Sequence, residues 1–376
     1  MTSPCVKILD PNGDLLIIVT ASTDAFAAWD GPQHDTTSAS EDETDRDSGD
    51  EEDRANEAMK KKGVASNTDD NNRNTPSNTL RMKASSSHLA LASQRFGRML
   101  KNAWPDLAVI HEEDGLRHWE TEAVDLAAFE IVMDVIHGHN RRVPRAVDLE
   151  MLAKVAVIVD DLQCREAVEI FVDMWLSKLE ESAPPRGLSY SRDLVLWIFI
   201  ASVFSHDEIF RSCTYTAVME TTGPISSLEL PIRGKIIDTL ESLRLEHLDA
   251  IMDILADAED RLKGIGGFYC CFGCDCALLG ALIIQMRSKG LLDPRPSRPY
   301  NDLSISNMIQ SIQNFEVPQY YQGSIRRGYN KHLDQTCYIG IDRGFEPLLF
   351  KQIRLLRDTI QLIHLKDDLG FTWGCT

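Results

Sequence analysis

Residues 122–176 read EAVDLAAFEIVMDVIHGHNRRVPRAVDLEMLAKVAVIVDDLQCREAVEIFVDMWL, and their apolar residues recur at the spacing of an α-helix. The recurring residues before Pro144 are Ala128, Phe129, Val132, Met133 and Ile136, and those after it are Leu149, Leu152, Val155, Ala156 and Val159. Polar residues fill the opposite faces, as in helices that pack on a small core. The stretch predicts two amphipathic helices joined by one turn at Pro144. It offers no acid–base pair, nucleophile or phosphate-binding loop, so we expect a binding surface rather than a reaction centre.

The composition limits the class of protein. A chain of 376 residues is long enough for about two domains of ~150 residues each. The net charge of −19 argues against binding to nucleic acid or to an anionic membrane surface, because no basic excess is available to neutralise phosphates. We expect no transmembrane span, because no apolar run reaches roughly 18 residues. The N-terminus lacks the basic flank and cleavage site of a signal peptide. The nine cysteines are therefore expected to be reduced, in a cytoplasmic or nuclear protein.

The N-terminal half alternates between structured and low-complexity segments. VKIL and DLLIIVT, on either side of the turn DPNG at residues 10–13, predict a β-hairpin. Residues 30–78 are acidic and nearly free of large apolar residues, so we predict that they are disordered. A strand is predicted at 80–85. One helix over residues 86–101 is expected to carry Leu89, Ala92, Phe96 and Leu100 on one side.

The C-terminal half is predicted to be all-helical. A double proline in residues 182–189 stops the preceding helix. A helix pair is then predicted at 194–221 and a long helix, with a break allowed in its middle, at 230–265. Three further helices are expected, at 277–292, 301–315 and 346–364, the first of them ended by Gly290.

These elements, in this order, resemble the BTB/POZ fold over about residues 6–179. The matching stretches are SSSHLALASQRFGRML (85–100), VDLAAFEIVMDVIHGHNRRVP (124–144) and LEMLAKVAVIVDDLQCREAV (149–168). The second resembles the Asp–x–x–Ala–Phe helix of the family. In the third, Cys164 is retained where the family usually reads Asp–Lys–Tyr–x–Cys, although Asp161, Leu162 and Gln163 depart from that wording.

The second half is similar to the C-terminal extension of a group of filamentous-fungal BTB proteins. The shared features are a cysteine cluster before an LGAL helix and then GLL–x–PRP–x–x–PY, here Gly290 to Tyr300. One departure is large. Most BTB domains join their second and third strands by a short turn, whereas here an acidic linker of about fifty residues intervenes. A loop of that length adds little closure entropy, since each doubling costs only ~0.6 kcal/mol.

The resemblance implies an α+β protein with a BTB/POZ domain at 5–181, interrupted by the insertion at 30–78. A Pro-rich linker at 182–189 and an α-helical domain at 190–376 would follow. It also implies a non-enzymatic adaptor that forms homodimers or BTB heterodimers, docks a cullin ubiquitin-ligase scaffold and holds an unidentified client protein. The alternative is a structural zinc-binding regulatory protein that uses the BTB fold only for oligomerisation.

One constellation of residues has the character of a metal site: Cys271, Cys274, Cys276, His332 and Cys337. Zinc prefers four thiolate or imidazole ligands, and a closed set of this kind would be a structural site. The alternative is that these cysteines are ordinary buried thiols. A catalytic Cys–His pair drawn from the same residues would need an oriented base and an oxyanion hole, and the sequence suggests neither.

Two further features of the sequence allow more than one interpretation. Ser40 and Ser48 each precede acidic residues, a pattern that an acid-directed kinase would accept, although a solvated spacer is the simpler interpretation. His137 and His139 flank Gly138 at the end of a predicted helix. Their position favours a charged histidine beside the helix dipole over a metal ligand.

Overall fold

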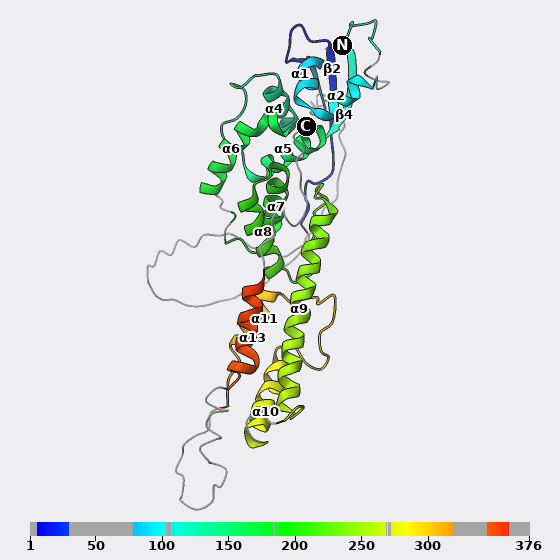
Figure 1. Ribbon diagram of the computed structural model, residues 1–376. Helices are drawn as coiled ribbons and strands as arrows, with labels where there is room; N and C mark the ends of the chain where they lie inside the picture. Colours follow the sequence, from blue (N-terminus) through cyan, green and yellow to red (C-terminus); the bar gives the residue numbers. More distant parts are fainter. Residues whose placement is uncertain are drawn as a thin grey trace, which may run out of the picture. The chain divides into compact units, whose positions relative to one another are not determined.

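The computed structural model describes residues 6–29, 78–102, 107, 109–182, 185, 187–267, 269, 272–318 and 344–360. Within these ranges the protein is α+β, with a four-stranded mixed sheet and helices in the first half and a mostly helical region after it (Figure 1). The chain divides into one unit of Met1–Trp29 with Thr79–Thr376 and a second of Asp30–Asn78. Apart from Asn78, the predicted disordered insertion lies outside the described residues. The division into two domains near residues 182–189 stays a prediction.

The sheet contains β1 (Val6–Ile8), β2 (Leu15–Ala21), β3 (Thr79–Ala84) and β4 (Arg117–Ala123) in the order β1-β3-β2-β4. Strand β2 runs antiparallel to β3 and parallel to β4, and β1 runs parallel to β3. The predicted hairpin is therefore wrong, because β3 lies between the two strands that were expected to pair. The strand at β3 is confirmed, whereas β4 was not predicted.

The turn at residues 10–13 forms as expected, but it carries the chain past the end of β3. The Gly13 N–H donates to the Asp10 carbonyl (3.0 Å), and the Leu9 N–H donates to the Lys83 carbonyl of β3 (2.9 Å). A Cβ atom on Gly13 would lie only 2.3 Å from the Ala84 carbonyl oxygen. The glycine is needed because the backbone of β3 passes this close. Strand pairing thus depends on a segment more than sixty residues away, which no local pattern reveals.

Residues 86–101 form two helices, α1 (Ser86–Ala92) and α2 (Gln94–Lys101), rather than the single predicted helix. They meet at Ser93, which has an extended backbone and no exposed surface. Its hydroxyl accepts from the Phe96 N–H (2.9 Å) and donates to the Leu162 carbonyl (2.5 Å). Ser93 thus caps α2 and also supplies a donor to the backbone carbonyl of Leu162. Both bonds favour the break between α1 and α2. Leu89 and Phe96 are fully buried, in agreement with the predicted apolar side.

The stretch at 122–176 contains α4 (Leu126–Ile136), α5 (Leu149–Leu162) and the start of α6 (Arg165–Ser182). The turn around Pro144 separates α4 from α5 as predicted. The expected second helix is divided at Gln163, which adopts a left-handed backbone conformation with φ of 54°. The carboxylates of Asp125 and Asp148 cap α4 and α5 by accepting backbone N–H bonds of 3.0 and 2.7 Å.

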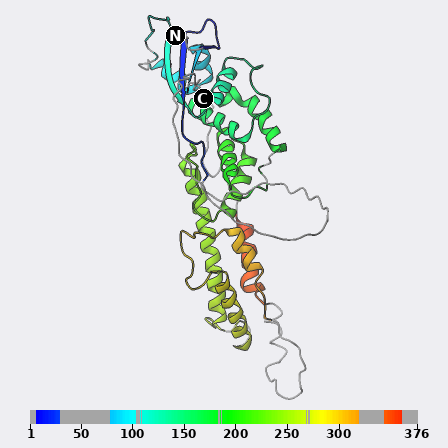
Figure 2. The same cartoon turned by 180° about the vertical axis from the view of Figure 1, so that it is seen from behind.

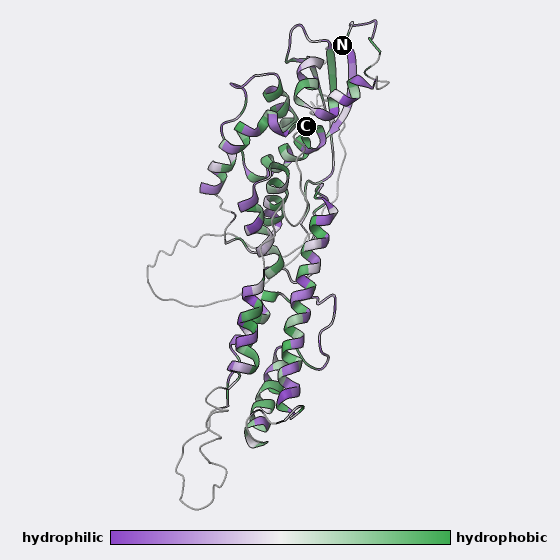
Figure 3. Ribbon diagram, in the orientation of Figure 1, coloured by the Kyte–Doolittle hydropathy of each residue, from purple (hydrophilic) through white to green (hydrophobic). Residues whose placement is uncertain are grey.

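The second half contains α7 (Arg192–Phe204), α8 (Asp207–Glu220), α9 (Gly234–Leu262), α10 (Phe272–Ser288) and α11 (Ile305–Gln313), followed by the π-helical η1 (Glu346–Phe350) and α13 (Lys351–Thr359) (Figures 1 and 2). These match the predicted helices, and α9 is unbroken. Every residue from Leu194 to Phe204 is buried, and α7 packs on α5, α6 and α8. By contrast, α9 alternates between hydrophobic and hydrophilic residues along its length (Figure 3).

The chain leaving β2 is held by charged side chains of α5 and α7. The Arg192 guanidinium donates to the carbonyls of Phe26 (3.1 Å) and Ala27 (2.9 Å) and to Glu150 (2.7 Å). Lys154 lies over the Phe26 ring, with its Nζ 5.6 Å from the ring centroid. Segment 26–27 is thereby attached to a helix that lies 165 residues further along the chain.

The Gly290–Tyr300 stretch runs along α9 and is held by the buried Arg244. Its guanidinium donates to the carbonyls of Pro299 (3.1 Å) and Tyr300 (2.8 Å) and pairs with Glu241 (3.0 Å). The Tyr300 hydroxyl donates to Asp249 (2.5 Å). Burial, together with this bond to Asp249, raises the pKa of Tyr300 to about 12, so the phenol stays protonated.

Candidate interaction surface

Strand β1 is an edge of the sheet and presents apolar side chains to solvent. Val6 and Ile8 are 39% and 52% exposed, whereas Lys7 between them is half-buried on the other face. In the described part of the chain, β1 pairs with β3 alone, so its outer backbone groups face away from the sheet. An exposed edge with apolar side chains is a template for pairing with another strand.

Lys7 fixes this short strand to α4. Its ammonium donates to Glu130 (2.5 Å) and to Asp134 (2.8 Å). The Asp134 side chain is only 5% exposed, and it also lies 3.1 Å from the His139 Nδ1 and 3.6 Å from the Arg142 guanidinium. A buried carboxylate needs such partners, because burying it unpaired would cost several kcal/mol. The position of the edge strand therefore depends on this set of charges.

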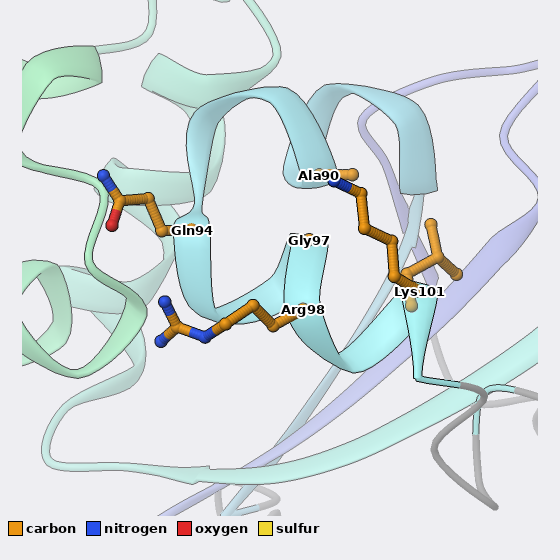
Figure 4. A pocket seen from close by; sticks show the side chains of 6 residues that line it. Ala90, Gln94, Gly97, Arg98 and Lys101 are labelled. Atoms are coloured by element: carbon orange, nitrogen blue, oxygen red, sulfur yellow. The ribbon is translucent and has the colours of Figure 1, made fainter. Parts of the chain in front are cut away.

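Helices α1 and α2 form a second surface, beside Leu91, which is 89% exposed. An open pocket of about 420 Å³ lies between these helices (Figure 4). Six residues line it: Ala90, Gln94, Gly97, Arg98, Leu100 and Lys101. The pocket could not be predicted from sequence, because Gly97 approaches the Ala90 carbonyl only when α1 and α2 fold back on one another.

Only two of the five predicted zinc ligands fall within the described residues. Cys274 and Cys276 lie on α10, where the first is buried and the second exposed. Residues two apart on a helix point about 200° apart, so this pair does not converge on one point. Among the described residues no group of three His, Cys, Asp or Glu side chains could hold a metal ion. Cys271, His332 and Cys337 lie outside the described residues, and the zinc site stays a prediction.

The two candidate phosphorylation sites, Ser40 and Ser48, also lie outside the described residues. Two cysteines not assigned to the zinc site are described: Cys164 and Cys213 are buried, and burial raises the pKa of each thiol to about 12. Both thiols therefore stay protonated near neutral pH and are poor nucleophiles.

His137 differs from the charged histidine that its position suggested. Its Nδ1 is 2.9 Å from the Met133 carbonyl, and its Nε2 accepts the Ser85 backbone N–H (3.1 Å). Only a neutral ring can donate at one nitrogen and accept at the other. Burial lowers the pKa of His137 below 6.5, which also favours the neutral form. His137 thus joins the end of α4 to the start of α1 as a neutral group.

Comparison with known proteins gives no match: no protein-family model, curated protein or solved structure resembles the chain closely enough to be significant. Within the described ranges, no helix is long and apolar enough to cross a bilayer.

Proposed function

We propose that this protein is a non-enzymatic adaptor that self-associates through a BTB/POZ-type domain at residues 5–181. The observation that carries the proposal is the exposed edge strand β1. It combines apolar side chains at Val6 and Ile8 with backbone groups that face away from the sheet. A second copy can add a strand to this edge, so that the apolar side chains are covered in both copies.

The adaptor role assigns different partners to different regions. A cullin ubiquitin-ligase scaffold is the partner that the sequence resemblance implies for the sheet-bearing half, and a client protein would be held by the helical half. Dimerisation or scaffold binding then acts by proximity, because linking two binding surfaces raises the effective concentration of one partner near the other.

The proposal is tested by the mass of the purified full-length chain in solution. Light scattering coupled to gel filtration should give twice the chain mass of 42.3 kDa. The double substitution Val6→Lys and Ile8→Lys should give the monomer mass, because two charges would be buried at the interface. Matched controls are Ile265→Lys and Leu355→Lys, at positions that are 62% and 50% exposed, and these should stay dimeric. A monomeric wild-type chain at about 100 μM, far above a micromolar Kd, would contradict the proposal.

The same sample separates the adaptor from the zinc-binding alternative. Elemental analysis before and after chelation should be run beside the light scattering. About one tightly held zinc per chain, with unfolding of the C-terminal half on chelation, would support a structural clamp at Cys271, Cys274, Cys276, His332 and Cys337. A metal-free dimer would leave the adaptor proposal standing and remove the clamp.

A further inference from the structure

Helix α2 is cationic in a strongly acidic protein. Residues 94–101 read QRFGRMLK, with three basic residues and no acidic residue, whereas the whole chain carries a net charge of −19. Arg95 pairs with Asp161, and Arg98 donates to the side-chain carbonyl of Gln163 (2.6 Å). Within the described residues, neither Arg98 nor Lys101 forms an ion pair. Two positive charges are thus left at the pocket between α1 and α2.

The pocket combines these charges with an apolar surface. Gln94 and Arg98 lie toward one end of it and Ala90 and Lys101 toward the other, with Gly97 between them (Figure 4). Gly97 lets α1 and α2 approach closely, because a Cβ atom there would lie 3.0 Å from the Ala90 carbonyl oxygen. Leu100 completes the apolar lining. The volume, about 420 Å³, falls within the ~300–1,000 Å³ range typical of ligand sites.

This combination restricts the ligand. A free phosphate would leave the apolar lining uncovered, and a polyanion such as RNA would be repelled by the net charge of −19. An anionic membrane would be repelled for the same reason. A short peptide with one apolar side chain between carboxylates meets both requirements and brings few negative charges with it.

We propose that the pocket between α1 and α2 binds a short acidic peptide segment of a partner protein. An apolar side chain of the peptide packs against Ala90, Gly97 and Leu100, and its carboxylates pair with Arg98 and Lys101. This inference goes beyond the self-association proposed above, because the pocket does not include β1.

The test measures fluorescence anisotropy of labelled pentapeptides with the full-length protein at low salt. The probe LEDLE carries both features, LQNLQ keeps the shape without the charge, and GEDGE keeps the charge without the apolar side chains. LEDLE should bind at least about tenfold more tightly than either control peptide, corresponding to about 1.4 kcal/mol. Its affinity should fall as salt is raised, because exposed charges are screened.

Variants locate the binding. Arg98→Glu with Lys101→Glu should weaken LEDLE binding about tenfold or more, while Lys289→Glu, an exposed lysine on no part of the pocket, should leave it within about twofold. Lys101→Glu alone keeps the Arg98–Gln163 bond and should give an intermediate loss. Unchanged circular dichroism would show that each variant is folded, and an unchanged mass in light scattering would separate the result from dimerisation.

Several outcomes would overturn the proposal. Equal binding of GEDGE would reduce the effect to charge attraction, and equal binding of LQNLQ would reduce it to apolar contact. An equal loss with Lys289→Glu would indicate long-range electrostatics in place of a site. Tighter binding of RNA or of anionic phosphatidylserine vesicles, lost in the same double variant, would assign the cations to a different class of partner.

Discussion

The sheet-bearing region and the helical region are held together by different forces. In the first, charged side chains near the surface join segments that are distant in sequence. The Asp14 carboxylate, for example, accepts bonds from the Ser86 N–H (2.9 Å) and hydroxyl (2.7 Å) and from Arg117 (2.9 Å). In the second, α7 is buried from Leu194 to Phe204, and the buried Arg244 holds the carbonyls of Pro299 and Tyr300. The helical region should therefore respond to lost volume, and the sheet-bearing region to lost charge and to pH.

The largest expected effect is that of Phe199→Ala in α7. Phe199 has no exposed surface, and truncating a buried phenylalanine costs about 3–5 kcal/mol through lost burial and the cavity left behind. The free energy of unfolding, measured by urea denaturation, should fall by this amount. Ile170→Ala in α6 is the matched control, because Ile170 is 83% exposed, and it should change stability by less than about 0.5 kcal/mol. If both substitutions lowered the free energy of unfolding by similar amounts, Phe199 would not lie in a tightly packed core.

The next effect tests Arg244, a fully buried charged residue of the helical region. Arg244→Met keeps the apolar length of the side chain but leaves the carbonyls of Pro299 and Tyr300 without their donor. We expect a loss of about 3 kcal/mol, because an unpaired buried group costs about 1–3 kcal/mol, the Tyr300 carbonyl is buried and the Pro299 carbonyl is partly buried. Arg287→Met removes an arginine that is 62% exposed and should have little effect. If Arg244→Met were neutral in urea denaturation, the residues around Tyr300 would be held by packing alone.

A smaller effect is expected for Asp134→Asn, which removes the buried carboxylate that holds Lys7. The loss should be about 2 kcal/mol, since bonds to charged groups contribute about 1.5–3 kcal/mol and Glu130 remains as a partner for Lys7. Asp161→Asn, which affects only an exposed pair with Arg95, is the control. Asp134→Asn should also weaken dimerisation in light scattering, because Lys7 positions β1. If the variant were destabilised but dimerised as the wild type does, β1 would not be part of the dimer interface.

The smallest effect is a pH dependence assigned to His137. Burial lowers its pKa in the folded protein below 6.5, so the unfolded chain binds more protons as the pH falls through this range. The contribution of His137 is complete above about pH 6.5 and is lost as the pH decreases toward the lower folded pKa. The melting temperature should be lower at pH 5.5 than at pH 7.5. His137→Gln, which can still accept the Ser85 N–H, should reduce this difference, and an unchanged difference would assign it to other groups.

Helices were predictable where one periodic pattern continued without interruption. The pair α7 and α8, the long α9, and α11 were all evident from the sequence for this reason. The breaks at Ser93 and Gln163 were not, because each depends on tertiary context: the Ser93 hydroxyl bonds to Leu162, and Gln163 adopts a left-handed backbone. Strand β4 was missed although Trp119 and Ala123 alternate with exposed residues. That period-two signal was available, and it is short.

The candidate surface was less predictable than the fold. The interior positions Val132 and Met133 are buried, as helical spacing indicated. To predict that Val6 and Ile8 are exposed, one would need the strand order, which local sequence does not encode. To predict the pocket at Gly97, one would need the break at Ser93, because α1 and α2 form the pocket only when they fold back on one another. Spacing alone suggested that Cys274 and Cys276 could share a metal ion, but helical geometry points them apart.

The bonds from Arg192 to residues 26 and 27 also set an order of folding. During synthesis the sheet-bearing region leaves the ribosome long before α7, and domains generally fold as units from the N-terminus. Here the carbonyls of Phe26 and Ala27 find their donor only when residue 192 has emerged. Until α7 has been synthesised, the surface of α5 that α7 covers stays exposed to solvent. Contacts this distant in sequence slow folding, and apolar surface exposed in the meantime is prone to aggregation.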